Sequence, residues 1–182
     1  MNTPRGKHVF FLVPVSREAG LTSMALGLVR ALQIAGLEVG FFKPIAQPEA
    51  VAGDADLSGH FARTLCGTSS PEPIAFGRAV EMVGTGRLSD LMEEVVAAFA
   101  AVDARHDVTV VEGLIPDADI QIASRLNMEI IRSLGADVLP VLSGEGRDVA
   151  EVAAKVAGAI EQYAGDGGRP RSEEHTSELQ SH

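Results

Sequence analysis

The stretch that decides the fold is HVFFLVPVSREAGLTSMALGLVRAL, residues 8–32. Its first eight residues, His8–Val15, are mostly apolar and rich in β-formers, which predicts a strand buried on both faces. From Gly20 onward the period changes, and Gly36 supplies the stop of a helix whose apolar positions are Leu21, Ala25, Leu28 and Leu32. The stretch therefore predicts a strand, a short loop and a helix in direct succession.

The same alternation of strand and helix continues along the chain. Apolar runs predict three further strands, over Glu38–Lys43, Asp107–Gly113 and Asp137–Ser143. Helical spacing predicts helices over Asp56–Leu65, Leu88–Asp103, Asp119–Leu134 and Arg147–Tyr163, whereas Ser69–Gly86 is expected to be a loop with one helical turn. Strands separated by helices predict an α/β fold, a parallel sheet with helices on both faces. Pro140 lacks the N–H of an interior strand residue, so the fourth strand is expected to pair poorly on one side there.

The helix over Leu88–Asp103 carries its own start signal. Ser89 or Asp90 is expected to cap it, because both side chains accept hydrogen bonds from the free N–H groups of a first turn. Glu93 and Glu94 are expected in that first turn, where negative charge suits the helix dipole.

Length and composition bound the class of protein. The chain has 182 residues, a formal charge of −10 and 46% hydrophobic residues, which indicates one globular domain and argues against a nucleic-acid surface. No apolar run approaches the roughly 18–20 residues that span a bilayer, and the polar start leads straight into a strand. The single cysteine, Cys66, has no internal disulfide partner. We therefore expect a cytoplasmic protein that contacts neither membrane nor nucleic acid.

The last twelve residues, 171–182, do not belong to the predicted fold. They read RSEEHTSELQSH, which resembles a sequencing adapter translated in frame. The predicted domain therefore spans residues 1–170, and residues 171–182 are expected to be an artefactual tail. One more strand is expected after the helix over Arg147–Tyr163, so this domain is predicted to be incomplete.

The loop between the first strand and the first helix has the position of a phosphate-binding loop. Such a loop reads GxxxxGK[ST], and its lysine and hydroxyl serve the terminal phosphates and a magnesium ion. Gly20 and Thr22 match it and are followed by Ser23, but Ser16 replaces the first glycine and Leu21 replaces the lysine. This degraded loop leaves open nucleotide binding, nucleotide hydrolysis or a structural role.

Two charged residues end neighbouring runs that are predicted to be strands. Lys43 ends the second strand and Glu112 the third, so both are expected beyond the carboxyl edge of the sheet, where ligands collect. Either they form an ion pair between strands, or they bind a ligand. Asp54 and Asp56 could join Thr22 and Glu112 around magnesium, which prefers oxygen ligands, or could serve only as turn-makers.

Several motifs together resemble one family. FFKPIAQP (41–48), GDAD (53–56), LMEEVVAAF (91–99), VEGLIPDADIQIASRLNMEI (111–130) and the opening run resemble the N-terminal domain of the long form of phosphate acetyltransferase. That domain is related to dethiobiotin synthetase and has a P-loop-like fold. The resemblance implies a magnesium site at Thr22, Asp54 and Glu112. It also implies a nucleotide or anion site at Gly20, Thr22, Ser23 and Lys43.

The resemblance also implies a function. The family enzyme interconverts acetyl-CoA and phosphate with acetyl phosphate and CoA, at a separate C-terminal domain that this chain lacks. The N-terminal domain is implied to regulate, through homo-oligomer assembly and response to a small-metabolite effector, with the missing C-terminal domains as partners. Our first hypothesis is therefore a regulatory, non-catalytic domain. An ATP-dependent ligase of the dethiobiotin synthetase or cobyrinate amidotransferase type is the alternative, and a purely structural oligomerisation module is the third.

Overall fold

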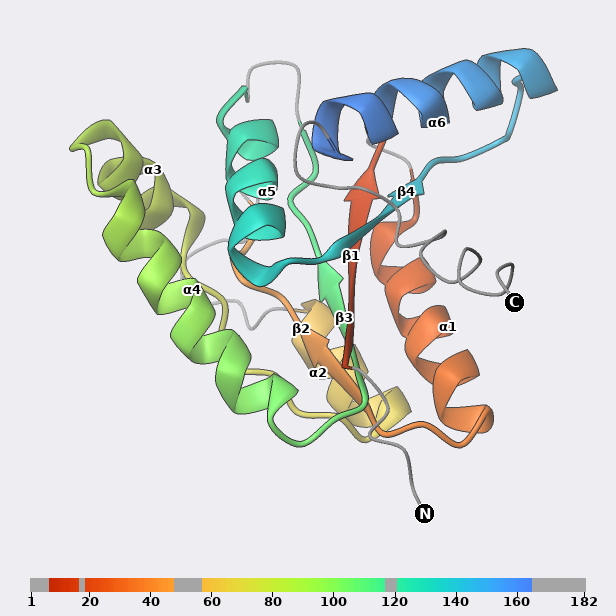
Figure 1. Cartoon of the computed structure of the whole chain (residues 1–182). Coiled ribbons are helices and arrows are strands. Elements are labelled where there is room, and N and C mark those ends of the chain that lie inside the picture. Colours follow the sequence, from red (N-terminus) through yellow and green to blue (C-terminus); the bar gives the residue numbers. More distant parts are fainter. Residues whose placement is uncertain (1–6, 17–18, 48–56, 117–120, 165–182) are drawn as a thin grey trace, which may run out of the picture.

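The computed structural model describes residues 7–16, 19–47, 57–116 and 121–164, and these form a parallel α/β sheet (Figure 1). The four strands of the described sheet lie in the order β2-β3-β1-β4, and every neighbouring pair is parallel. Their bounds are β1 His8–Pro14, β2 Val39–Phe42, β3 Val108–Glu112 and β4 Asp137–Val141. The predicted α/β class and the predicted strands are confirmed.

Six helices within the described residues connect and cover these strands. Their bounds are α1 Leu21–Ile34, α2 Leu57–Cys66, α3 Phe76–Gly84, α4 Leu88–Asp103, α5 Gln121–Leu134 and α6 Val149–Ala164. On one face of the sheet, α1 and α2 pack in a cluster with Leu12, Phe41 and Val110. On the other face, α3, α4, α5 and α6 pack in a cluster with Phe11, Phe42 and Val111 (Figure 1). Consecutive strand residues thus enter opposite clusters, as expected for strands covered on both faces.

The register of the sheet brings the ends of β1, β2 and β3 to one edge. Leu12 pairs with Glu112, and Phe42 pairs with Val111. The residue after β2 is Lys43 and the last residue of β3 is Glu112, so their side chains start from the same edge of the sheet. This edge is where a parallel α/β fold collects functional groups.

Pro140 lies in β4, one of the two edge strands of the described sheet. It pairs with Val13 of β1, and β4 has β1 as its only partner strand among the described residues. An edge strand can tolerate a proline, because the side of the strand without a partner needs no N–H donor. This agrees with the expectation that the fourth strand pairs poorly on one side.

Three local predictions are wrong. The expected loop over 69–86 contains the helix α3, whose buried residues Ala79 and Met82 face α4 and the core. The turn-forming glycines near this segment predicted a loop, but burial of the apolar face stabilises a helix there. The helix α4 has the predicted bounds, but its N-cap residue is Arg87, so neither Ser89 nor Asp90 caps it. Asp90 is the acidic residue of its first turn, and Glu93 and Glu94 are not in that turn as expected.

A surface ion pair joins α3 to α4. The guanidinium nitrogens of Arg78 donate to both carboxylate oxygens of Glu94, at 2.7 and 2.6 Å. The hydrogen bond from Arg78 holds the pKa of the Glu94 carboxyl below its ordinary value, and Glu94 in turn raises the pKa of Arg78. Both groups are exposed to solvent, so this pair orients α3 more than it stabilises the fold.

Gly113 is a position where the fold admits no side chain. A Cβ atom there would lie 2.5 Å from the Phe11 ring and 2.9 Å from the Leu12 carbonyl oxygen. Gly113→Ala should therefore lower the free energy of unfolding by about 1–3 kcal/mol. Gly27→Ala is the matched control, because a Cβ in the middle of α1 meets nothing within 4 Å and should stabilise by about 0.5–1 kcal/mol. Urea unfolding of both variants checks this, and equal effects would contradict the close packing at Gly113.

Candidate functional site

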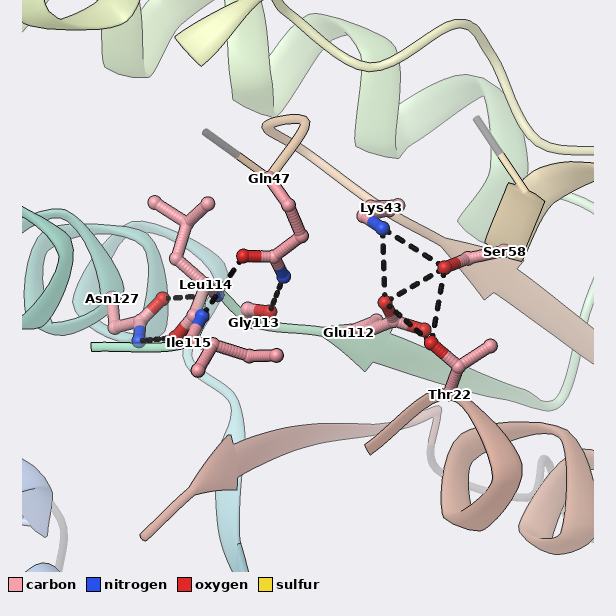
Figure 2. Close-up of polar contacts among 9 residues, drawn as sticks. All are labelled: Thr22, Lys43, Gln47, Ser58, Glu112, Gly113, Leu114, Ile115 and Asn127. Atoms are coloured by element: carbon pink, nitrogen blue, oxygen red, sulfur yellow. Dashed lines mark hydrogen bonds and ion pairs between the residues drawn. The ribbon is translucent and has the colours of Figure 1, made fainter. Parts of the chain in front are cut away.

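Four polar side chains from four separate segments converge at the carboxyl edge of the sheet (Figure 2). Thr22 is the second residue of α1, Lys43 directly follows β2, Ser58 is the second residue of α2 and Glu112 ends β3. We call these four residues the Glu112 cluster. The structure thus brings together Thr22, Lys43 and Glu112, three of the residues that the sequence analysis selected.

One carboxylate oxygen organises the cluster. Glu112 Oε1 lies 3.0 Å from Lys43 Nζ and accepts hydrogen bonds from Ser58 Oγ at 2.9 Å and from Thr22 Oγ1 at 3.2 Å. Lys43 also donates to Ser58 Oγ at 2.9 Å, and the Thr22 and Ser58 hydroxyls lie 3.2 Å apart. Each side chain therefore contacts at least two others, as the dashed lines of Figure 2 show.

The cluster is shielded from water. The exposed fractions of the Lys43 and Glu112 side chains are 4% and 1%, so the predicted interpretation of an ion pair between strands is confirmed. Removing one partner of such a pair leaves a buried, uncompensated charge, which costs about 3–5 kcal/mol. The pair therefore ties the end of β2 to the end of β3.

The second oxygen of Glu112 differs from the first. Glu112 Oε2 is buried and has no hydrogen-bond partner within the part of the chain that the structure describes. A buried polar atom without a partner is uncommon and marks a position where a further donor or a cation would be favoured. Asp54 and Asp56, which the sequence analysis placed near magnesium, lie outside the described residues. No three His, Cys, Asp or Glu side chains of the described ranges gather as a metal site.

The junction before α1 has a glycine directly before the helix, as a phosphate loop does, but lacks the lysine of such a loop. Gly20 has φ 66°, the left-handed conformation that glycine adopts without strain, and precedes the first residue of α1. Leu21, at the position of the lysine, is 3% exposed and packs in the apolar cluster beneath α1. Ser23 is exposed and stands apart from the Glu112 cluster, so of the selected loop residues only Thr22 reaches it.

Two amide side chains hold the backbone that follows Glu112. Gln47 donates to the Gly113 carbonyl at 3.2 Å and accepts from the Ile115 N–H at 3.1 Å. Asn127 of α5 accepts from the Leu114 N–H at 2.9 Å and donates to its carbonyl at 2.8 Å. These amides satisfy the peptide groups of residues 113–115 from two sides (Figure 2).

The sequence analysis assigned no site role to Ser58, Gln47 or Asn127. Asn127 could have been selected from the sequence, because it is a polar residue among the apolar positions of α5 and a buried polar residue needs hydrogen-bond partners. Gln47 belongs to the FKPIAQP motif, but its spacing gave no hint that it reaches the backbone after β3. Ser58 shares the buried face of α2 with Ala62, which made it indistinguishable from a small packing residue.

A separate cavity and the single cysteine lie elsewhere. The cavity holds about 270 Å³ between residues 67–71 and the end of α4, near the amino end of β3, so it is not part of the Glu112 cluster. Cys66 is half-buried at the end of α2. Burial raises the pKa of its thiol, although Arg30 acts in the opposite direction, and the thiol is therefore poorly suited to nucleophilic chemistry.

The fold and the loop define a class of protein: a P-loop-like α/β domain in which the phosphate lysine is replaced by leucine. Comparison with known families agrees, because the family described as "AAA domain" matches residues 8–162. The chain belongs to this family.

Curated relatives narrow the resemblance to phosphate acetyltransferase. The chain is 38% identical to the phosphate acetyltransferase of Pseudomonas putida over 162 residues, 89% of this chain and 23% of that protein. It is 35% identical to that of Pseudomonas aeruginosa, covering 87% and 22%, and 40% identical to that of Deinococcus radiodurans, covering 84% and 22%. The predicted resemblance is confirmed, and the chain spans less than a quarter of the length of these relatives.

Solved structures share the fold at low identity. The cell division protein FtsY of Thermotoga maritima has a TM-score of 0.56 and 13% identity, over 86% of this chain and 50% of that one. The signal recognition particle receptor FtsY of Elizabethkingia anophelis has a TM-score of 0.53 and 16% identity, over 88% and 51%. These likenesses confirm the fold class. None of the helices in the described ranges is long and apolar enough to cross a membrane.

The Asn127 amide offers a direct test of the loop after Glu112. Asn127 is fully buried, and Asn127→Asp removes the donor to Leu114 and buries a carboxylate. We expect the free energy of unfolding to fall by about 3 kcal/mol or more at pH 7. Gln162→Glu on the exposed face of α6 is the control for the same chemical change and should be nearly neutral. Urea unfolding measures both, and a neutral Asn127→Asp would refute the role of this amide.

Proposed function

We propose that this chain is a regulatory and oligomerisation segment of a cytoplasmic phosphate acetyltransferase and does not itself transfer the acetyl group. The whole enzyme would interconvert acetyl-CoA and phosphate with acetyl phosphate and CoA. This segment would correspond to its N-terminal domain, with the missing C-terminal domains as partners. The similarity to phosphate acetyltransferases over less than a quarter of their length supports the proposal.

The burial of Leu21 is the observation that best supports the proposal that this segment is not catalytic. Phosphoryl transfer is catalysed mainly by positioning and by positive charge on the phosphates, and the loop lysine supplies part of that charge. Here the corresponding side chain is apolar, 3% exposed and packed among residues of α1 and the sheet. The start of α1 therefore offers the Thr22 hydroxyl to an anion, but no ammonium group at the position of the loop lysine.

Magnesium would fit this site only in part. Thr22 Oγ1 and Glu112 Oε2 are oxygen atoms of the kind that magnesium binds, and Oε2 has no partner among the described residues. Magnesium bound there would offset the charge of a nucleotide phosphate. Glu112 Oε1, however, is already held by Lys43, Ser58 and Thr22. We therefore regard a nucleotide with magnesium as a weak ligand of Gly20, Thr22, Ser23 and Lys43.

An ATP-dependent ligase of the dethiobiotin synthetase or cobyrinate amidotransferase type is the alternative. The observation that favours it is the convergence of Thr22, Lys43 and Glu112, which the resemblance to dethiobiotin synthetase implies for a magnesium and phosphate site. The buried Leu21 favours the regulatory function, because a ligase needs a charged contact to the terminal phosphate.

Release of inorganic phosphate from ATP separates these two functions. We expect the full chain with Mg²⁺ to release none above background, because the loop lacks the charge that stabilises the transferring phosphoryl group. Leu21→Lys should lower the melting temperature, because it places an ammonium group in an apolar cluster. Phosphate release by the parent chain that Thr22→Ala abolishes would overturn the proposal that this segment is non-catalytic.

The assembly role has its own experiment. We expect the full-length protein that contains this segment to form a homo-oligomer, and deletion of residues 1–170 to reduce its mass in light scattering to that of smaller species. The acetyltransferase rate of the deletion variant serves as the control that the remaining domains are folded. An unchanged oligomer mass would refute the assembly role and leave response to a metabolite as the regulatory one.

A further inference from the structure

The cavity near the amino end of β3 is lined by polar groups from two segments. Residues 67–71, which follow α2, form one wall, and Ala101, Val102, Arg105 and His106 at the end of α4 form the other. Its volume of about 270 Å³ is below the range of about 300–1,000 Å³ that is usual for drug-sized ligands. The cavity therefore fits a molecule of few atoms.

The lining carries positive charge and no carboxylate. Arg105 is a permanent cation, and no Asp or Glu is among the described residues that line the cavity. The last residue of α4, Asp103, is bound elsewhere, because its carboxylate accepts from Lys7 Nζ at 2.9 Å. Asp107 accepts from a backbone N–H at 3.1 Å, and Glu72 is exposed outside the lining. The charge of the cavity therefore favours an anion.

Arg105 keeps most of its donors for a ligand. A guanidinium group has five N–H donors, and within the described residues Arg105 uses one of them, to the Ala101 carbonyl at a long 3.4 Å. A cation at this place also complements the dipole of α4. The carbonyls of Ala100 and Val102 at the helix end, however, already accept from peptide N–H groups. The planar guanidinium matches two oxygens of a phosphate or carboxylate group.

Further polar groups of the lining have no partner in the described part of the chain. Thr68 is 5% exposed, and its buried hydroxyl forms no hydrogen bond there. The peptide N–H groups of Ser69 and Ser70 have no acceptor within those residues either. His106 Nδ1 donates to the Val102 carbonyl at 2.6 Å, because a carbonyl only accepts, so Nε2 is the ring nitrogen left for a ligand.

The wall at His106 is formed before any ligand binds. The imidazole packs on Gly40 of β2, where a Cβ atom would lie 2.7 Å from His106 Nδ1. The hydrogen bond to Val102 holds the ring from the other side. Binding therefore requires little ordering of this wall, which lowers the entropic cost of taking up a ligand.

We propose that this cavity binds a small oxyanion, a molecule with one phosphate or carboxylate group, through Arg105 and the donors of residues 68–70. The proposal names the chemical class of the effector for the proposed regulatory function, and as an effector site it rests on that function. His106 lies before the first residue of β3 and Glu112 is the last, so the cavity and the Glu112 cluster lie at opposite ends of one strand. The oxyanion would therefore not compete for the Glu112 cluster.

Binding of inorganic phosphate and of acetate to the full chain tests the proposal without nucleotide. Isothermal titration calorimetry measures the affinity, with sodium chloride at matched ionic strength as the reference, and the two anions distinguish a phosphate group from a carboxylate. Arg105→Gln should weaken binding at least tenfold, because it removes the charge and the planar pair of donors. Arg132→Gln is the matched control, because it removes an exposed arginine from the last turn of α5 outside the cavity lining, and it should bind as the parent does.

The melting temperature gives a second readout. An oxyanion at ten times its dissociation constant should raise the melting temperature of the parent by roughly 3–6 °C. At the same concentration the rise for Arg105→Gln should be less than half as large, because tenfold weaker binding leaves that site half occupied.

Ala101→Leu tests the cavity separately from the charge. It keeps Arg105 and fills part of the cavity, so it should also weaken binding, whereas Ala97→Leu, one turn earlier on α4 and outside the lining, should not. Absence of saturable binding by the parent would overturn the proposal. Equal weakening by the two arginine variants, or parent-like binding by Ala101→Leu, would do the same. These outcomes leave the lack of turnover untouched, whereas phosphate release from ATP would overturn the proposed function and leave oxyanion binding in place.

Discussion

The buried pair between Lys43 and Glu112 is the interaction on which this edge of the molecule depends. It joins the ends of β2 and β3, two strands that are far apart in the chain, at a place where water does not screen their charges. Thr22 and Ser58 bind the same carboxylate oxygen, so α1 and α2 are tied to that point too. Burying both charges costs desolvation free energy, which their mutual attraction and the two hydroxyl hydrogen bonds offset.

The same edge explains why two motifs occur together in this chain. FKPIAQP contributes Lys43 and Gln47, and VEGL contributes Glu112 and the backbone that Gln47 binds. The two segments thus contact each other through one ion pair and one amide. Gly113 completes the contact because the Phe11 ring leaves no room for a side chain there.

Much of the fold could be predicted, because apolar periodicity reports burial directly. The strands of the sheet and the helix α1 follow from it. The helix α3 could not be predicted, since glycines and prolines dominate its surroundings and its stability comes from packing against α4. The bounds of α4 were predicted correctly, but its cap was not, because Ser89 and Asp90 have the chemistry of a cap, whereas the N-cap residue is Arg87. Propensity is a weak guide where tertiary contacts decide.

The sequence by itself determined the α/β class, the loss of the loop lysine at Leu21 and the presence of charges at the ends of two strands. It did so because these are properties of residue type and local spacing. Only the tertiary structure decided that Lys43 and Glu112 contact each other, that Ser58 lies between them and that Asn127 holds the following loop. Those contacts join residues 13–69 positions apart, and their geometry follows from strand register and helix packing, which local spacing does not encode.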